Sequence, residues 1–244
     1  MSENIIYIAL MAVGASFVQQ ATGFGFGIFI MTALPYLMPS YGEATTLSGL
    51  LALTTSLVAV TGFLKHITWK RFIPIISAFV LTSTIFICLV SRIEGQIMRM
   101  ILGGMLILIS LYFSFFKSRI QKIIKPNLRW QIGTGTVSGV MGGLFGMQGP
   151  PAVLYFLTSE PDKNHYMGMI LMYAVISNTM MTIVRAINGF VTPTVGITYL
   201  YALAGIALGG LAGRWAFKRI PNGIFTYVVY AYIGISGLII LLTA

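Results

Sequence analysis

Two glycine-rich segments hold the residues of this chain that are best suited to bind a ligand. The first is Gln20-Ala21-Thr22-Gly23-Phe24-Gly25-Phe26-Gly27, and the second runs from Gly142 to Pro151. Glycine lets a backbone come close to a ligand and adopt φ values that other residues avoid. Where such a segment breaks a membrane helix, free N–H groups and the positive end of the helix dipole attract anions. We therefore predict an anion-binding site that contains Gln20, Thr22, Gly23, Gly25, Gly27, Gly142, Gly143, Gly146, Gln148 and Gly149.

Two polar residues of other apolar stretches, Asn178 and Arg185, are added to this predicted site. An asparagine amide is costly to bury unless it is hydrogen-bonded. Arg185 lies apart from the loops where the other basic residues gather, and two interpretations stand. It is either an arginine that snorkels from a helix end to the membrane surface or a counter-charge for an anion. Glycines in membrane helices also serve close packing, which is the interpretation of the series from Gly205 to Gly213.

The composition places these segments in a lipid bilayer. The chain of 244 residues is 57% hydrophobic and 8% charged, and its 15 Lys and Arg face five Asp and Glu. Soluble domains carry about 25% charged residues, so a water-soluble fold is excluded, and the apolar content excludes a disordered chain. The basic residues lie between apolar runs and form no patch interleaved with aromatic residues. This pattern argues against binding to nucleic acid.

The uncharged stretches of the sequence predict the membrane spans. A spanning helix needs about 20 predominantly apolar residues, and six stretches supply one each: 44–64, 72–91, 100–116, 164–184, 186–213 once its start is trimmed, and 220–244. Two stretches are too long, because 4–42 contains 39 residues and 130–159 contains 30. A straight helix over the longer one would extend on the order of 58 Å at about 1.5 Å per residue. Both segments must therefore break, as re-entrant hairpins or as discontinuous, kinked spans.

The chain is predicted to be an all-α polytopic membrane protein with two repeated halves. The halves are residues 1–116 and 130–244, joined by a basic cytoplasmic loop at 117–129. A shift of 121 residues pairs Phe24-Gly25 with Phe145-Gly146 and Ser56 with Ser177. Each half is then a glycine-broken long segment followed by three transmembrane helices, as expected of an internal duplication.

The distribution of basic residues favours inverted halves. If both long segments return to the side on which they enter, twelve Lys and Arg face the cytoplasm and three do not. If both segments cross the membrane, the corresponding numbers are nine and six. Because cytoplasmic loops carry an excess of Lys and Arg, the inverted arrangement is predicted, with both termini outside the cytoplasm.

These features resemble the sulfite exporter TauE/SafE family of membrane permeases. The resemblance rests on the segment from Gln20 to Gly27 and on the more specific segment from Gly139 to Pro151, and it covers essentially the whole chain. The first segment departs from the family's commoner consecutive glycines, because Phe24 and Phe26 are interleaved. The resemblance implies transport of a small sulfur oxyanion or organosulfonate, such as sulfite or sulfoacetate, across the inner (cytoplasmic) membrane.

A secondary transporter or facilitator that exports such an anion is the leading hypothesis. The alternatives are a proton-coupled uptake carrier for a related organic anion and a membrane accessory subunit that does not transport. An enzyme is not expected, because the uncharged stretches hold no Asp or Glu and both histidines, His66 and His165, lie at stretch ends. No metal or other cofactor is expected for the same reason. The expected partners are a small anion and the lipid bilayer, without nucleic acid, and the sequence leaves open whether a homo-oligomer forms.

Overall fold

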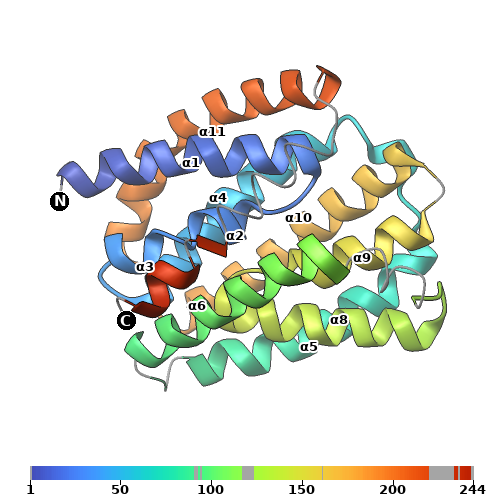
Figure 1. Cartoon of the computed structure of the whole chain (residues 1–244), viewed down its shortest axis with the longest axis horizontal. Coiled ribbons are helices and arrows are strands. Elements are labelled where there is room, and N and C mark those ends of the chain that lie inside the picture. Colours follow the sequence, from blue (N-terminus) through green and yellow to red (C-terminus); the bar gives the residue numbers. More distant parts are fainter. Residues whose placement is uncertain are drawn as a thin grey trace.

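The computed structural model describes residues 2–90, 93, 95–116, 124–160, 162–219, 234–235 and 237–242, and this part of the chain contains helices and no strands (Figure 1). The helices of the first half are α1 (Ser2–Thr22), α2 (Phe26–Ile30), α3 (Leu34–Leu37), α4 (Tyr41–Val60), η1 (Leu64–His66), α5 (Trp69–Val90), α6 (Gly95–Leu111) and the π-helical turn η2 (Tyr112–Phe116). Those of the second half are α8 (Leu128–Phe145), α9 (Gly149–Ser159), α10 (Lys163–Ile187) and α11 (Pro193–Arg219). The all-helical prediction is therefore confirmed.

Five of the described helices are long and apolar enough to cross a membrane. They contain the segments Ile5–Thr22, Tyr41–Val60, Trp69–Val90, Lys163–Ile187 and Pro193–Trp215, and α6 is a shorter apolar helix. The predicted spans at 44–64, 72–91, 100–116, 164–184 and 186–213 coincide with α4, α5, α6, α10 and α11. Most of the predicted span at 220–244 and residues 117–123 of the predicted loop lie outside the described residues.

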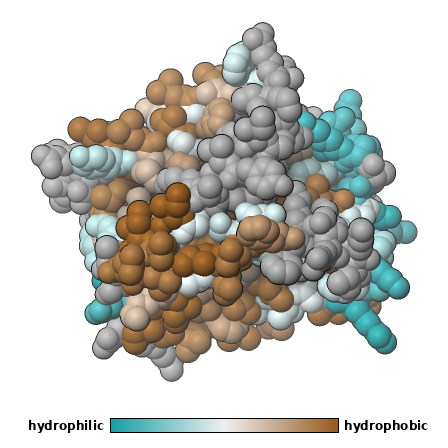
Figure 2. Space-filling view, in the orientation of Figure 1, coloured by the Kyte–Doolittle hydropathy of each residue, from teal (hydrophilic) through white to brown (hydrophobic). Residues whose placement is uncertain are grey.

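The outer surface of the helix bundle is largely apolar. Large side chains such as Leu81, Leu200 and Leu208 are about two-thirds exposed, at 68%, 66% and 64%. Figure 2 shows hydrophobic residues over the middle of one face and hydrophilic residues along its right-hand edge, where α8 begins and α9 ends in Figure 1. An apolar surface of this extent is stable against lipid chains and unstable in water, so the chain is a multi-pass membrane protein.

The first glycine break follows α1 and turns the chain back on itself. α1 ends at Thr22, and the next residues pass through Gly23 and Gly25, both with positive φ, before α2 begins at Phe26. The Thr22 hydroxyl donates to the carbonyl of Val18 at 2.9 Å and accepts from the N–H of Phe24 at 3.3 Å. α2 and α3 then lead back toward the end of the bundle at which α1 begins (Figure 1).

The second glycine break joins α8 to α9. α8 ends at a left-handed Gly146 with φ of 68°, whose N–H donates to the carbonyl of Gly142. α9 starts three residues later at Gly149, with prolines in its first turn, where no intrahelical N–H bond is lost. In Figure 1, α1 runs from left to right whereas α8 runs from right to left, and α9 returns alongside α8.

Ionic contacts connect the helix ends on the right of Figure 1. These contacts lie outside the apolar spans. Arg71, at the start of α5, pairs with Glu160 at 3.6 Å and donates to the carbonyl of Ser159 at 2.8 Å. Asp162 caps α10 by accepting from the backbone N–H groups of Asn164 and His165. The backbone and ring of His165 lower the pKa of the Asp162 carboxyl, because both donate hydrogen bonds that stabilise its charged form.

Glycine series allow two pairs of parallel helices to pack closely, with backbone against backbone at several positions. Along α11, the sites of Gly205, Gly209 and Gly213 face the backbones of Ala9, Val13 and Phe17 of α1. Along α8, the sites of Gly135, Gly139 and Gly143 face the backbones of Ile75, Phe79 and Ser83 of α5. The predicted packing role of Gly205 to Gly213 is therefore confirmed, and it agrees with the use of small residues at membrane helix interfaces.

We expect Gly209→Ala to destabilise the protein by about 1–3 kcal/mol, the range for overpacking a tight interface. The new Cβ would overlap the backbone carbonyl of Val13, which cannot rotate away. Gly196→Ala on the same helix is the matched control, because nothing in the described part of the chain lies within 4 Å of that Cβ position. Thermal unfolding in detergent should show a lower midpoint for Gly209→Ala alone, and equal midpoints would contradict the packing role.

Candidate functional site

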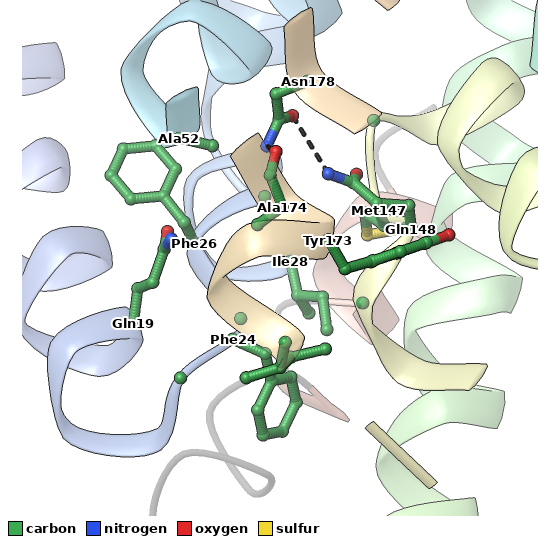
Figure 3. A pocket seen from close by; sticks show the side chains of 16 residues that line it. Gln19, Phe24, Phe26, Ile28, Ala52, Met147, Gln148, Tyr173, Ala174 and Asn178 are labelled. Atoms are coloured by element: carbon green, nitrogen blue, oxygen red, sulfur yellow. Dashed lines mark hydrogen bonds between the residues drawn. The ribbon is translucent and has the colours of Figure 1, made fainter. Parts of the chain in front are cut away.

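A small cavity lies between the two glycine breaks (Figure 3). Its volume is about 40 Å³, which is room for a few water-sized groups. The wall is formed by residues 23–28 of the first break, residues 146–149 of the second break, Gln19 of α1, Ala52 of α4, and Ile170, Tyr173, Ala174 and Asn178 of α10. Both halves of the chain therefore contribute to the wall of one cavity.

The two breaks touch each other backbone to backbone. A Cβ at Gly27 would overlap the carbonyl oxygen of Gly146 and would lie 3.6 Å from the hydroxyl of Ser48. Gly25 and Gly146 also have left-handed backbones, with φ of 94° and 68°, a conformation that disfavours residues with a Cβ. The glycines are therefore required by the close approach of the breaks and by the turns that reverse the chain.

A hydrogen-bonded amide pair forms the polar wall from the second half. The amide nitrogen of Gln148 donates to Oδ1 of Asn178 at 3.0 Å and to the hydroxyl of Ser177 at 3.2 Å, and the first of these bonds is drawn in Figure 3. Asn178 in turn donates to the carbonyl of Ala174 at 2.7 Å. An amide nitrogen has two N–H groups, so Asn178 keeps one donor beyond this bond. The pair holds two amides rigidly at the cavity.

A matching arrangement forms the wall from the first half. The amide nitrogen of Gln19 donates to the hydroxyl of Ser56 at 2.6 Å, and that hydroxyl donates to the carbonyl of Ala52 at 2.7 Å. Ser56 and Ser177, the serines that recur at a spacing of 121 residues, thus each accept a bond from a cavity-lining glutamine of their own half. The amide oxygen of Gln19 is buried and has no partner among the described residues.

The sequence comparisons identify the family. The family model of the sulfite exporter TauE/SafE matches residues 8–240. The chain belongs to the TauE/SafE family. It is also 28% identical over 219 residues to the probable sulfite/organosulfonate exporter TauE of Cupriavidus necator, a match that covers 84% of this chain and 81% of that protein. No solved structure matches the chain.

Membership of the TauE/SafE family makes this protein a membrane transporter, in agreement with its apolar helices. The family activity is transport, in agreement with the leading hypothesis from the sequence. Among the described residues, no cluster of three His, Cys, Asp or Glu side chains is arranged to hold a metal ion.

The structure brings seven of the predicted site residues of this TauE/SafE protein together at the cavity: Gly23, Gly25, Gly27, Gly146, Gln148, Gly149 and Asn178. Five others lie elsewhere. Thr22 holds the turn after α1, as described above. Gly143 packs against Phe86 and the Ser83 carbonyl of α5, and Gly142 lies behind Gln148.

Gln20 faces α11 and not the cavity. Its Cβ lies 2.7 Å from the Cβ position of Gly213, and its amide nitrogen is 3.5 Å from the carbonyl of Thr55. The neighbouring Gln19 takes the place predicted for Gln20, with a side chain that is 2% exposed. The helical period could have identified it, because Gln19 and Gly23 are four residues apart and so share one face of a helix.

Arg185 is buried inside the protein at 1% exposure. Its guanidinium donates to the carbonyl of Thr45 at 3.0 Å, to that of Gly142 at 3.0 Å and to that of Gly143 at 3.5 Å. The snorkelling interpretation is therefore wrong, because the side chain points between α4 and α8 and not to the membrane surface. Arg185 does not line the cavity either. Its cation lies near the carbonyl end of α8, where the helix dipole favours positive charge.

Proposed function

We propose that this TauE/SafE protein is a facilitator that exports a small sulfur oxyanion or organosulfonate across the inner membrane. The cavity between the two glycine breaks is proposed as the substrate site. The observation that carries this proposal is the composition of its wall, where backbone of both breaks and the amides of Gln148 and Asn178 converge. None of the described residues that line it is acidic. Such a wall offers an anion backbone N–H groups and the second N–H of Asn178, held in place by Gln148, and no repelling charge.

Each part of the wall has a role in this proposal. The first turn of α2 has N–H groups without intrahelical acceptors. In α9, Pro150 and Pro151 have no N–H, so Gly149 supplies the donor beside the positive end of the helix dipole. The spare donor of Asn178 supplies a side-chain bond. The volume of about 40 Å³ favours a compact oxyanion such as sulfite in this conformation. An organosulfonate would require the breaks to move apart.

The course of the helices supports inverted halves with the cavity at their interface. α4 begins on the left of Figure 1, beside the start of α1, and α10 begins on the right. The two tightly packed pairs, α1 with α11 and α8 with α5, are equivalent to each other, because each joins the long-segment helix of one half to the second helix after the long segment of the other half. We infer that the right-hand end, with its hydrophilic edge and the basic residues Arg71 and Lys163, faces the cytoplasm.

Proton-coupled uptake of a related anion is a second candidate because of Glu43. This carboxylate is 7% exposed at the start of α4 and accepts hydrogen bonds from Thr192 at 2.6 Å and Ser40 at 3.2 Å. A buried carboxylate can exchange a proton during transport. Glu43 lies outside the cavity wall, so proton-coupled uptake ranks second to facilitated export.

Flux measurements with the purified protein in liposomes test the proposed function. We expect saturable flux of sulfite, weaker flux of sulfoacetate and little flux of acetate, because the wall recognises a compact oxyanion. Thiosulfate provides a larger inorganic anion for comparison. Protein-free liposomes are the control. Absence of flux for every one of these anions would contradict the proposal and favour an accessory subunit.

A further inference from the structure

A strip of buried polar residues leads away from the cavity along α10. Asn178, Thr182 and Arg185 are four and three residues apart, so they share one face of the helix. All three converge on Gly49 of α4. A Cβ at Gly49 would lie 3.9 Å from Oδ1 of Asn178, 3.6 Å from the hydroxyl of Thr182 and 3.4 Å from Nη1 of Arg185.

Several hydroxyl groups along this strip have no partner among the described residues. The atoms are Oγ1 of Thr182, Oγ of Ser48 and the hydroxyl of Tyr41. Ser48 is completely buried, and its hydroxyl lies within 3.9 Å of the Cβ positions of both Gly27 and Gly146. Buried polar groups are almost always hydrogen-bonded. Unpartnered hydroxyls on either side of Gly49 therefore point to a ligand that completes their bonding.

The charge of Arg185 is also uncompensated by any described residue. Its three acceptors are neutral backbone carbonyls, although a guanidinium has five N–H groups. In the part of the chain that the structure describes, no carboxylate lies within 4.0 Å of it. A buried cation is expensive without an opposite charge, and an ionisable residue inside a membrane protein indicates a functional position.

Beyond Arg185 lies an open vestibule of about 400 Å³. Its wall includes Ser40, Tyr41 and Gly42 at the start of α4, Gln96 and Arg99 at the start of α6, and Phe190. Tyr41 connects the two regions, because it lines the vestibule and lies within electrostatic range of Arg185. The ring of Phe190 is packed onto Gly42. Arg185 thus lies between the cavity and a vestibule that contains a second cation.

We infer that Arg185, Thr182 and Ser48 form a second anion-binding position, which the anion occupies as it passes Gly49 from the cavity to the vestibule. This inference rests on the proposed function and adds a route and a direction to it. The route ends where α4 begins, which is the end away from the cytoplasm in the inferred orientation. In this conformation the space beside Gly49 is narrow, so the anion moves when α4 and α10 separate slightly.

Gly49→Ala distinguishes a role of Gly49 in the anion route from a purely structural role. The new Cβ makes only ordinary van der Waals contacts, and alanine is a better helix former than glycine. We expect an unfolding midpoint no lower than that of the wild type and a sulfite flux reduced by about tenfold or more, because the methyl group narrows the passage. Gly104→Ala in α6, with no described residue within 4 Å of its Cβ position, is the control and should keep the wild-type flux.

Thr182→Val tests the chemistry of the position. It removes a hydroxyl that has no partner, so a purely structural role predicts unchanged or raised stability and unchanged flux. The second anion position predicts the same stability with a several-fold loss of flux. Wild-type flux in both Gly49→Ala and Thr182→Val would overturn this inference and leave the proposed function intact. A wild-type protein that carries none of the anions would overturn the proposed function itself.

Discussion

Ala174→Leu should reduce anion flux about a hundredfold. Binding an anion beside the larger side chain would overpack the cavity at a cost of about 3 kcal/mol, which converts to that factor in the affinity of the site for the anion. Ala174 lies on α10 and lines the cavity between the glycine breaks. Leucine adds three carbons to a space of about 40 Å³, which leaves no room for a sulfite-sized anion. Flux of sulfite into proteoliposomes measures the loss, and thermal unfolding in detergent reports whether the variant folds.

The design of this experiment follows from the backbone of the cavity. Gly25 and Gly146 have positive φ, so a side chain there strains the turn whatever the space and confounds a loss of transport with misfolding. Ala174 and Ala52 are ordinary helical positions, and Ala52→Leu should block the same cavity from α4. Ala186→Leu on the exposed face of α10 is the matched control. If both cavity variants fold and transport normally, the substrate site lies elsewhere.

The rate and direction of anion transport should depend on the membrane potential. A monovalent anion that leaves a cell at 100 mV, inside negative, gains about 2.3 kcal/mol, which supports roughly a fifty-fold outward gradient. The cavity wall has no acidic residue among the described ones, so the site itself offers no carboxylate to carry a proton with the anion. We therefore expect net efflux that is electrogenic and needs no coupling ion.

A potential clamped with potassium and valinomycin, at equal pH on both sides, measures this dependence. Reversal of the potential should reverse the direction of net sulfite flux. Flux that ignores the potential and follows an imposed pH gradient would contradict the facilitator and favour proton-coupled uptake. In that case Glu43→Gln should abolish the response to pH, because Glu43 is a buried carboxylate at the start of α4, next to the vestibule-lining Gly42.

Much of the framework could be predicted from the sequence, because lipid imposes a simple rule on it. A spanning helix must be apolar over about 20 residues, so the spacing of charges marks α4, α5, α6, α10 and α11 without knowledge of their packing. Glycine density likewise marks the turns after α1 and α8, since few other residues accept positive φ. The glycine motifs also carried the resemblance to the TauE/SafE family.

Which side chains face the site depends on the rotation of each helix about its axis. The spacing of charges along the sequence does not determine that rotation. Gln19 faces the cavity and Gln20 faces α11, although the two are neighbours in a segment that is apolar on all sides. Gly142 and Gly143 belong to the glycine-rich motif, yet they lie behind Gln148 and against α5, where backbone contact also requires glycine. Composition alone does not separate glycines that approach a ligand from those that approach a helix.

Sequence by itself determined the solvent of this protein, the order of its helices and the places where its chain turns back, because these follow from local polarity and local backbone freedom. Only the tertiary structure decided what Arg185 does. A lone arginine near a helix end has the same sequence pattern whether it reaches lipid headgroups or turns inward. The direction depends on α4 and α8, which bring the carbonyls of Thr45 and Gly142 to its guanidinium from 140 and 43 residues away.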